Sequence, residues 1–301
     1  MGPPAETWRN TARGGPGVPQ TESVIAAGVR HGDTSAPAAL VGIAHGTNAP
    51  AGQAAVATLM RAVAAAAPHL RVALGFVDVQ QPDTPAALAT LPPPAPAIIV
   101  PLLLSAGYHV HVDLTDAVRT ANDRHVVLGA TLGPDDRLVA LLRRRLVEAG
   151  MLDADTIVLG AAGSSDARAV ADCRAVAEGL SQALRRPVTI GFLSAAEPRL
   201  AAAITTARAQ NPGRRVLLSS YLLAPGYFQG LAEAAGADEA TAPLLRADSP
   251  APRELVDVVL DRYRAAGHPL TRAARRIVRI SSRKHHRPRG ALRRVTADDR
   301  T

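Results

Sequence analysis

Short apolar runs alternate with longer amphipathic stretches through most of the chain. Four apolar runs in the first half predict strands, because such runs suit strands that are buried on both faces of a parallel sheet. They are Ala39–Ala44, Arg71–Asp78, Ile98–Leu104 and His125–Ala130. Helices are predicted by apolar positions at helical spacing over Gly52–Ala67, Thr84–Leu91, Asp135–Ala149 and a stretch that begins near Val112. This alternation predicts an α/β fold with a mostly parallel sheet flanked by helices.

The second half of the chain repeats the plan of the first. Its apolar runs predict strands over Thr156–Gly160, Val188–Leu193 and Arg215–Leu223. Four landmarks recur in the same order at offsets of 116 to 119 residues: Gly46 with Gly163, Gly75-Phe76 with Gly191-Phe192, Pro82 with Pro198, and Gly107-Tyr108 with Gly226-Tyr227. A tandem duplication of an α/β unit of about 115 residues is therefore expected, with two lobes in one chain.

The composition divides the chain into four segments. Residues 1–37 are rich in Gly, Pro and polar residues without periodicity and predict a disordered tail, followed by lobes over 38–150 and 151–266. The segment 267–301 is basic. Eleven Arg or Lys and two Asp give residues 268–301 a net charge of +9, so the rest of the chain carries −1 of the total +8. A basic tail can bind nucleic acid or a membrane surface, but a solvated, disordered extension is the favoured interpretation.

Composition also limits the class of protein. Hydrophobic residues make up 47% and aromatic residues 3%, so the core is expected to be aliphatic. The single cysteine, Cys173, excludes a disulfide within the chain and a metal site built from several cysteines, and it fits a reducing compartment. The sequence shows neither a signal peptide nor an apolar stretch long enough to cross a membrane. A cytoplasmic location is expected.

Three polar residues follow successive predicted strands of the first half. His45 follows the first strand, Asp78 ends the second and His109 follows the third. The carboxyl ends of parallel strands meet at one edge of the sheet, so these residues are expected to converge. Two imidazoles and a carboxylate suit an open divalent-metal site, and the same groups can accept protons near neutral pH. Taken singly, each histidine is equally compatible with a solvated loop position, and Asp78 with a turn or helix cap.

The second half lacks all three groups. Ala162 stands at the position of His45, Ser194 at that of Asp78 and Phe228 at that of His109, whereas the Gly and Pro landmarks are kept. The simplest interpretation is one lobe that carries the chemistry and one that has lost it.

Three segments together resemble the sirohydrochlorin chelatase and cobaltochelatase family of siroheme and cobalamin biosynthesis. They are LVGIAHGT (Leu40–Thr47), GFVDVQQPD (Gly75–Asp83) and IIVPLLLSAGYHVHVDL (Ile98–Leu114), of which the third is the most distinctive. The resemblance extends over about Ala38 to Ala266. It implies the fold of class II chelatases, with two α/β lobes around a cleft, and ATP-independent insertion of a divalent ion into a tetrapyrrole.

The resemblance also implies roles for the candidate residues. His45 and His109 match the metal-handling histidines of the family, and both are assigned as catalytic residues and metal ligands. Asp78 is also assigned as a catalytic residue. It stands where the family commonly has a glutamate, so its carboxylate is one methylene shorter and is expected to act on the metal or a proton through water. A neutral imidazole can take one of the two pyrrole N–H protons of sirohydrochlorin.

The substrate metal is expected to be Co²⁺, Fe²⁺ or Ni²⁺, which imidazole suits, and no other cofactor is expected. The tetrapyrrole is a polycarboxylate, for which Arg61, Arg119 and Arg124 are available, although a solvated helix face is favoured for each. The physiological metal and the choice between the two pathways stay open. Since one chain supplies both lobes, a monomer is expected.

The sequence leaves three other classes of function open. A metal or tetrapyrrole carrier would use the same site without turnover. A protein that binds nucleic acid through the basic tail is not favoured, since the tail lacks interleaved aromatic residues. A nucleotide-binding enzyme ranks last, because no G-x-G-x-x-G follows the first strand and no G-x-x-x-x-G-K-[ST] occurs.

Overall fold

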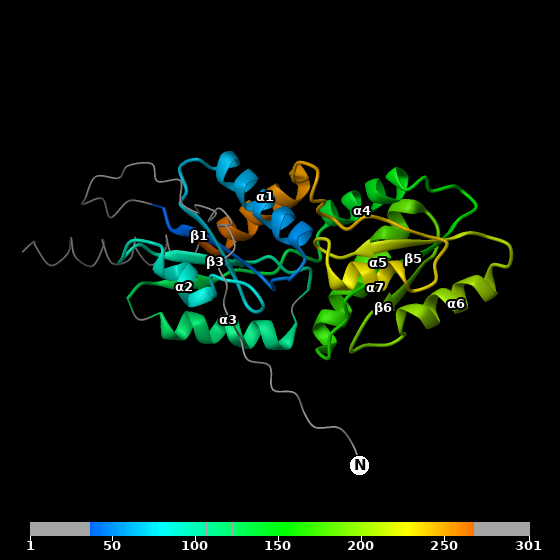
Figure 1. The fold of residues 1–301 in the computed structure, drawn as a ribbon, viewed down its shortest axis with the longest axis horizontal. Coiled ribbons are helices and arrows are strands. Elements are labelled where there is room, and N and C mark those ends of the chain that lie inside the picture. The colour runs from blue at the N-terminus through cyan, green and yellow to red at the C-terminus, as the bar shows by residue number, and fades with distance from the viewer. Residues whose placement is uncertain (1–36, 106, 122, 268–301) are drawn as a thin grey trace, which may run out of the picture. The chain divides into compact units, whose positions relative to one another are not determined.

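The computed structural model describes residues 37–105, 107–121 and 123–267, and for residues 108–113 it describes the backbone alone. Within these residues the chain forms two four-stranded parallel sheets, one after the other along the sequence (Figure 1). The first sheet has the order β2-β1-β3-β4 and consists of β1 (Ala39–Ala44), β2 (Val72–Phe76), β3 (Ala97–Pro101) and β4 (Val126–Leu128). The second has the order β6-β5-β7-β8 and consists of β5 (Thr156–Ala161), β6 (Val188–Phe192), β7 (Val216–Tyr221) and β8 (Glu239–Ala240).

Helices connect the strands in both halves. They are α1 (Pro50–Ala66), α2 (Thr84–Ala89), α3 (Tyr108–Thr120), α4 (Asp136–Glu148), α5 (Ala167–Leu184), α6 (Leu200–Gln210) and α7 (Tyr227–Glu233), and residues 253–267 are also helical. The predicted α/β fold with two tandem lobes is confirmed. We call the β1–β4 sheet with its connecting helices the first lobe, and the β5–β8 sheet with its connecting helices the second lobe.

One predicted boundary is wrong in a way that affects a candidate residue. The helix expected near Val112 begins four residues earlier, at Tyr108, after Gly107 in extended conformation. Imidazole and β-branched side chains have modest helix propensity, and they masked the start of this helix in the sequence. The backbone of His109 therefore belongs to the first turn of α3 and not to a loop.

The two halves repeat each other in backbone detail. Gly46 and Gly163 follow the first strand of each lobe with φ of 99° and 90°. Val79 and Ala195 follow the second strand with φ of 50° and 53°. The peptide N–H of residue 78 donates to the carbonyl of residue 45, and residue 194 repeats this bond to residue 162. Such agreement supports a duplication.

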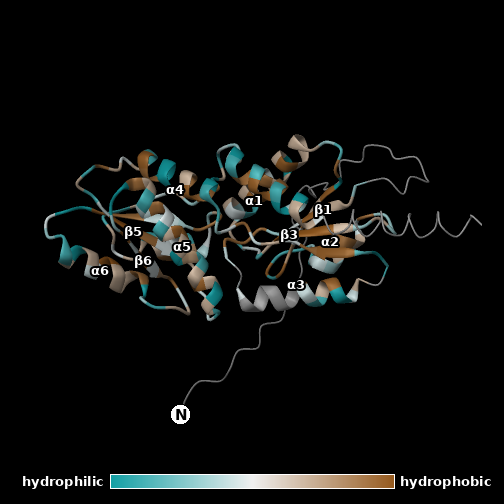
Figure 2. Cartoon of the chain, turned by 180° about the vertical axis from the view of Figure 1, so that it is seen from behind, coloured by the Kyte–Doolittle hydropathy of each residue, from teal (hydrophilic) through white to brown (hydrophobic). Residues whose placement is uncertain are grey.

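The largest core cluster, which is mostly aliphatic, runs through both lobes, and each lobe also has a smaller cluster of its own. The largest cluster contains Leu40 and Leu59 of the first lobe, Leu159 and Leu180 of the second, and Leu255 of the last helix. Figure 2 shows hydrophobic residues concentrated in β1, β3 and β5, with hydrophilic residues on the outer sides of helices such as α1 and α6. Among the described helices, none is both long enough and apolar enough to cross a bilayer.

Two helices pack away from the half of the sequence to which they belong. Helix α4 ends the first repeat but packs against α5 and β7. The helix at 253–267 ends the second repeat but lies beside α1 (Figure 1), and its Tyr263 hydroxyl donates to the Ala38 carbonyl at 2.6 Å. The guanidinium of Arg262 donates to the carbonyls of Thr131 and Leu132 at 2.7 and 2.8 Å. Each half of the sequence thus contributes a helix to the other.

Candidate functional site

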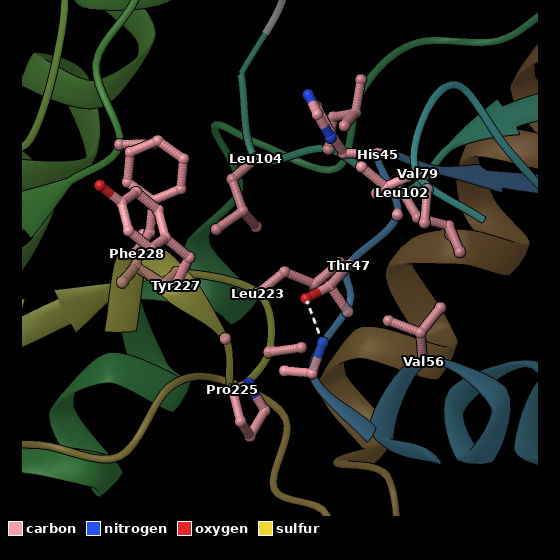
Figure 3. Close-up of a pocket in the computed structure, with 18 of the residues that line it drawn as sticks. His45, Thr47, Val56, Val79, Leu102, Leu104, Leu223, Pro225, Tyr227 and Phe228 are labelled. Carbon is pink, nitrogen blue, oxygen red and sulfur yellow. Dashed lines mark hydrogen bonds between the residues drawn. The ribbon is translucent and has the colours of Figure 1, made fainter. Parts of the chain in front are cut away.

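A pocket of about 740 Å³ lies at the carboxyl ends of strands from both lobes. The first lobe contributes residues 44–49 after β1 and 102–105 after β3, and the second contributes 161–163 after β5 and 221–228 after β7. Ligands bind at this edge of open α/β sheets, and the volume suits a drug-sized ligand. The pocket is therefore the candidate site (Figure 3).

His45 lines this pocket, as the strand pattern predicted. It follows β1 directly, its side chain is exposed, and no residue in the described part of the chain hydrogen-bonds to its ring. The backbone behind it is tightly fixed, since a Cβ on Gly46 would lie 2.1 Å from the Asp78 carbonyl oxygen. Neither ring nitrogen bonds to another described residue, so His45 can take a proton or bind a metal ion without breaking a bond to this part of the chain.

Hydrogen bonds order the loop between His45 and α1. The Thr47 N–H donates to Gln80 Oε1 at 2.9 Å, and the Thr47 hydroxyl accepts the Ala49 N–H at 3.1 Å (dashed in Figure 3). Gln53 Nε2 donates to the Thr47 carbonyl at 2.8 Å. Thr47 and Gln80 line the pocket but were not singled out from the sequence. The sequence did contain a signal for Gln80. This polar residue is replaced by Ala196 in the second copy, which also lacks the other candidate groups.

The Asp78 side chain has a different surrounding from that of His45. It is exposed, and its Oδ1 accepts the Val79 N–H at 2.7 Å. The next two residues, Val79 and Gln80, line the pocket, whereas Asp78 is absent from the lining. In this conformation the carboxylate therefore stabilises the turn after β2, and the next residue, Val79, is the one that lines the pocket.

The side chain of His109 lies outside the described residues. The segment that leads to it, Leu102–Ser105, lines the pocket, so the start of α3 is close to the site. Among the described side chains, no cluster of three or more His, Cys, Asp or Glu forms a metal site. The backbone thus places the start of α3, which carries His109, two residues after a segment that lines the pocket.

The three candidate arginines do not line the pocket. Arg61 is exposed on α1 and donates to Thr58 Oγ1 at 2.8 Å, and Arg119 lies 3.6 Å from Asp116 on α3. Arg124 is buried, pairs with Asp123 at 2.7 Å, and precedes β4, at the edge of the sheet opposite to the pocket. The solvated helix face expected for Arg124 is therefore wrong, since the residue follows the end of α3 and its ion pair allows it to be buried. No Lys or Arg occurs among the described residues that line the pocket. Its walls are apolar, and the expected cationic lining is missing there.

Cys173 and Tyr221 close the pocket on its inner side. Burial raises the pKa of the Cys173 thiol to about 11, although a hydrogen bond with Ser105 acts in the opposite direction. In the metal-free protein the cysteine is therefore a neutral thiol near pH 7. The Tyr221 hydroxyl donates to the Leu104 carbonyl at 2.9 Å and so joins the two lobes next to the pocket.

The second lobe presents apolar groups where the first presents candidate chemistry. Ala162 and Phe228, which match His45 and His109, both line the pocket. The hydroxyl of Ser194, which matches Asp78, donates to the Ala162 carbonyl at 2.9 Å. In the second lobe these positions therefore offer packing surface and internal hydrogen bonding.

Comparison with known proteins relates both lobes to chelatases. The model of the family CbiX matches residues 39–149 and 156–241. The fold is similar to that of SirB from Bacillus subtilis with Fe³⁺, with 20% sequence identity, a TM-score of 0.63, and coverage of 77% of this chain and 96% of that one. No curated protein sequence matches the chain.

Two further structures share the fold. The sirohydrochlorin chelatase SirB from Bacillus subtilis subspecies spizizenii, in complex with cobalt, is 17% identical with a TM-score of 0.58, over 78% of this chain and 97% of that one. CbiX, described as the terminal enzyme for biosynthesis of siroheme in denitrifying bacteria, is 20% identical with a TM-score of 0.50, over 74% of this chain and 98% of that one. At these identities the likeness establishes the architecture of two lobes.

Proposed function

The chain belongs to the CbiX family of class II chelatases, and from this premise we propose that it inserts Co²⁺ or Fe²⁺ into sirohydrochlorin without ATP, in siroheme or cobalamin biosynthesis. One observation carries the proposal. The His45 imidazole, with no partner in the described part of the chain, lines a pocket of about 740 Å³. The residue that matches His45 in the second lobe, Ala162, lines the same pocket. A reactive group and a packing surface thus face one space.

The reaction exchanges one divalent ion for two protons. The M²⁺ ion enters the macrocycle, the two pyrrole N–H bonds break, and two protons leave. In this proposal His45 and His109 bind the incoming ion and accept protons, because neutral imidazole does both near pH 7. Asp78 receives protons through water, since its carboxylate points into the turn after β2.

The surroundings of His45 favour transfer of the ion to the macrocycle over its retention. A site with few protein ligands holds a divalent ion loosely, whereas thiolate ligands would trap it. Among the described residues that line the pocket, His45 and the buried Cys173 are the only His, Cys, Asp or Glu, which fits such a transfer site. The apolar walls contributed by residues 102–104 and 222–225 exclude water from the macrocycle while the protons leave.

Anaerobic absorbance spectroscopy of metal-free sirohydrochlorin with Co²⁺ or Fe²⁺ tests the proposal. We expect catalytic amounts of protein to accelerate metal insertion over many turnovers. His45→Ala and His109→Ala should each lower kcat about 10²-fold or more, the size typical of general acid–base groups. His69→Ala is the matched control, because His69 is exposed and lies outside the pocket lining.

The alternatives predict different results. Tight tetrapyrrole binding without turnover would identify a carrier. Insertion activity that survives both substitutions would place the reactive site elsewhere. Initial rates with Co²⁺, Fe²⁺ and Ni²⁺ under matched conditions would rank the three substrate ions.

A further inference from the structure

Two aromatic side chains stand exposed at the rim of the pocket. Tyr227 is 75% and Phe228 38% exposed, and both line the pocket from the first turn of α7. Their rings form an edge-to-face pair, with centroids 5.7 Å apart and planes at 72°. The chain has only three Phe, four Tyr and one Trp, so two of its eight aromatic residues are exposed at this one place. Exposed apolar groups gathered at a pocket mark a ligand contact.

An exposed valine faces this pair from the first lobe. Val79 is 51% exposed and lines the pocket. Its φ of 50° is in the left-handed region, which β-branched residues rarely adopt, and the bond from its N–H to Asp78 Oδ1 supports this conformation. Figure 3 shows Val79 beside His45, with Tyr227 and Phe228 on the other side of the pocket. Apolar side chains of the two lobes thus flank the same space.

The position of the aromatic pair is fixed by tight packing between the lobes. A Cβ on Gly52 of α1 would lie 2.2 Å from the Pro225 carbonyl oxygen, so the glycine lets the segment before α7 approach α1. Within the second lobe, Gln229 is buried and its Nε2 donates to the Thr241 carbonyl at 3.1 Å. These contacts hold α7 in place, so the two rings are presented on a fixed support.

The two copies differ at the residues that flank the pocket. Phe228 occupies the position of His109, while Val79 of the first lobe corresponds to Ala195 of the second. No described Lys or Arg lines the pocket. A conjugated macrocycle has flat apolar faces, whereas its carboxylates lie on its periphery and can stay in water.

We infer that Tyr227 and Phe228 form the wall on which one face of the tetrapyrrole macrocycle packs, with Val79 against the opposite face and His45 at its centre. This inference rests on the proposed function. Because the two rings are inclined at 72°, one lies along the macrocycle face and the other meets it with its edge. The second lobe, which has lost the reactive groups, binds the substrate.

Titration of the full-length protein with metal-free sirohydrochlorin under anaerobic conditions tests this inference. The double substitution Tyr227→Ala with Phe228→Ala should raise Kd about tenfold or more, since stacking on an aromatic wall contributes energies of that order. Tyr227→Phe and Phe228→Tyr keep the rings and should stay within about twofold of the wild type. Leu152→Ala is the control for loss of an exposed apolar side chain, since Leu152 is 60% exposed and outside the pocket lining.

Steady-state kinetics distinguish a substrate wall from a structural role. In the double variant KM should rise with Kd while kcat falls by no more than about threefold, because the wall acts in binding and not in proton transfer. A wild-type Kd in a folded double variant overturns the inference and leaves the proposed function standing. Binding that depends on the rings without metal insertion by the wild type upholds the inference and contradicts the proposed function. A wild-type protein that binds no sirohydrochlorin contradicts both.

Discussion

At the scale of single residues, the backbone behind His45 depends on the absence of one side chain. Gly46 has φ of 99°, and a Cβ there would lie 2.1 Å from the Asp78 carbonyl oxygen and 2.9 Å from Val79 Cγ2. The oxygen belongs to backbone that also bonds to the His45 carbonyl through the Asp78 N–H at 3.0 Å. The turns after β1 and β2 therefore interlock, and this contact holds His45 beside Val79.

Gly46→Ala is expected to destabilise the fold by about 3 kcal/mol or more, because left-handed strain and a clash with backbone add together. Gly150→Ala is the matched control. Its φ is 71° but nothing lies within 4 Å of the added Cβ, so about 1 kcal/mol is expected from conformation alone. Urea unfolding followed by circular dichroism measures both. Equal losses would show that the contact between the two turns does not constrain residue 46.

At the scale of elements, the start of the second sheet is tied by a buried carboxylate. Asp155 directly precedes β5 and Arg215 directly precedes β7, and the two strands pair from Thr156 with Val216 onward. The Arg215 guanidinium donates to the Asp155 carboxylate at 2.7 and 3.1 Å, and the Leu152 N–H donates at 2.8 Å. The ion pair thus joins the residues that immediately precede two neighbouring strands.

The pair has a pH signature. The hydrogen bonds from Arg215 hold the pKa of Asp155 below its ordinary value, so its stabilising effect is complete above the unfolded-state pKa of about 3.9 and is lost as the pH falls through the lower folded pKa. Asp155→Asn should cost about 1–3 kcal/mol between pH 5 and 8, and the difference from the wild type should narrow below about pH 4. Asp153→Asn, at a fully exposed carboxylate near Arg186, serves as control and should have no measurable effect. Free energies of unfolding across this range provide the measurement, and a difference independent of pH down to pH 2 would contradict the assignment.

Elements were predictable where one local pattern specified them. The apolar run Ala39–Ala44 is β1 to the residue, because all six of its side chains are buried. Strand β8 is only two residues long and partly exposed, so no apolar run in the sequence predicted it. The predicted start of α3 was four residues too late, because the first turn of this helix has no strong apolar periodicity. Local pattern also placed His45, which follows directly from the end of a strand.

Other parts of the site arise from contacts between distant segments, which a local pattern does not contain. Gln80 reaches Thr47 across 33 residues, and the Tyr221 hydroxyl reaches Leu104 across 117. The exposure of Tyr227 and Phe228 depends on how α7 packs. Comparison of the two copies within the chain identified Phe228 as the counterpart of His109, but it did not show that this side chain lines the pocket.

At the scale of the whole molecule, the exchange of helices between the repeats makes the lobes depend on each other. Helix α4 packs on the second lobe. The helix at 253–267 forms ion pairs with α4 through Asp261 and Glu254, and its Tyr263 bonds to Ala38 before β1. Arg137 at the start of α4 pairs with Asp135 at 2.8 Å and with Asp261 of the last helix at 2.6 Å. Since the core is continuous across these helices, the described part of the chain is expected to unfold as one cooperative unit.

Truncation tests this dependence. A chain that ends at Ala251 loses the Arg262 and Tyr263 hydrogen bonds and the five buried aliphatic side chains of the last helix, namely Leu255, Val256, Val258, Val259 and Leu260. At about 1.5–3 kcal/mol for each buried aliphatic side chain, the loss is comparable to the whole stability of a typical domain of 5–15 kcal/mol. We therefore expect this chain to show no cooperative thermal transition in either lobe, although its β5–β8 sheet is complete.

A chain that ends at Gly267 is the control for that truncation, since it keeps every contact that the last helix makes with the described residues. Its Tm should stay within a few degrees of the full-length value. Arg262→Ala tests the same link by one side chain. It leaves the carbonyls of Thr131 and Leu132 without their guanidinium partner and should lower the Tm of both lobes together. Hydrogen exchange reports the lobes separately. Protection lost only in the first lobe, with β5–β8 unchanged, would show that the lobes fold independently and that the exchanged helices are attachments to them. Loss in both would make the pocket, which needs walls from each lobe, a property of the intact molecule.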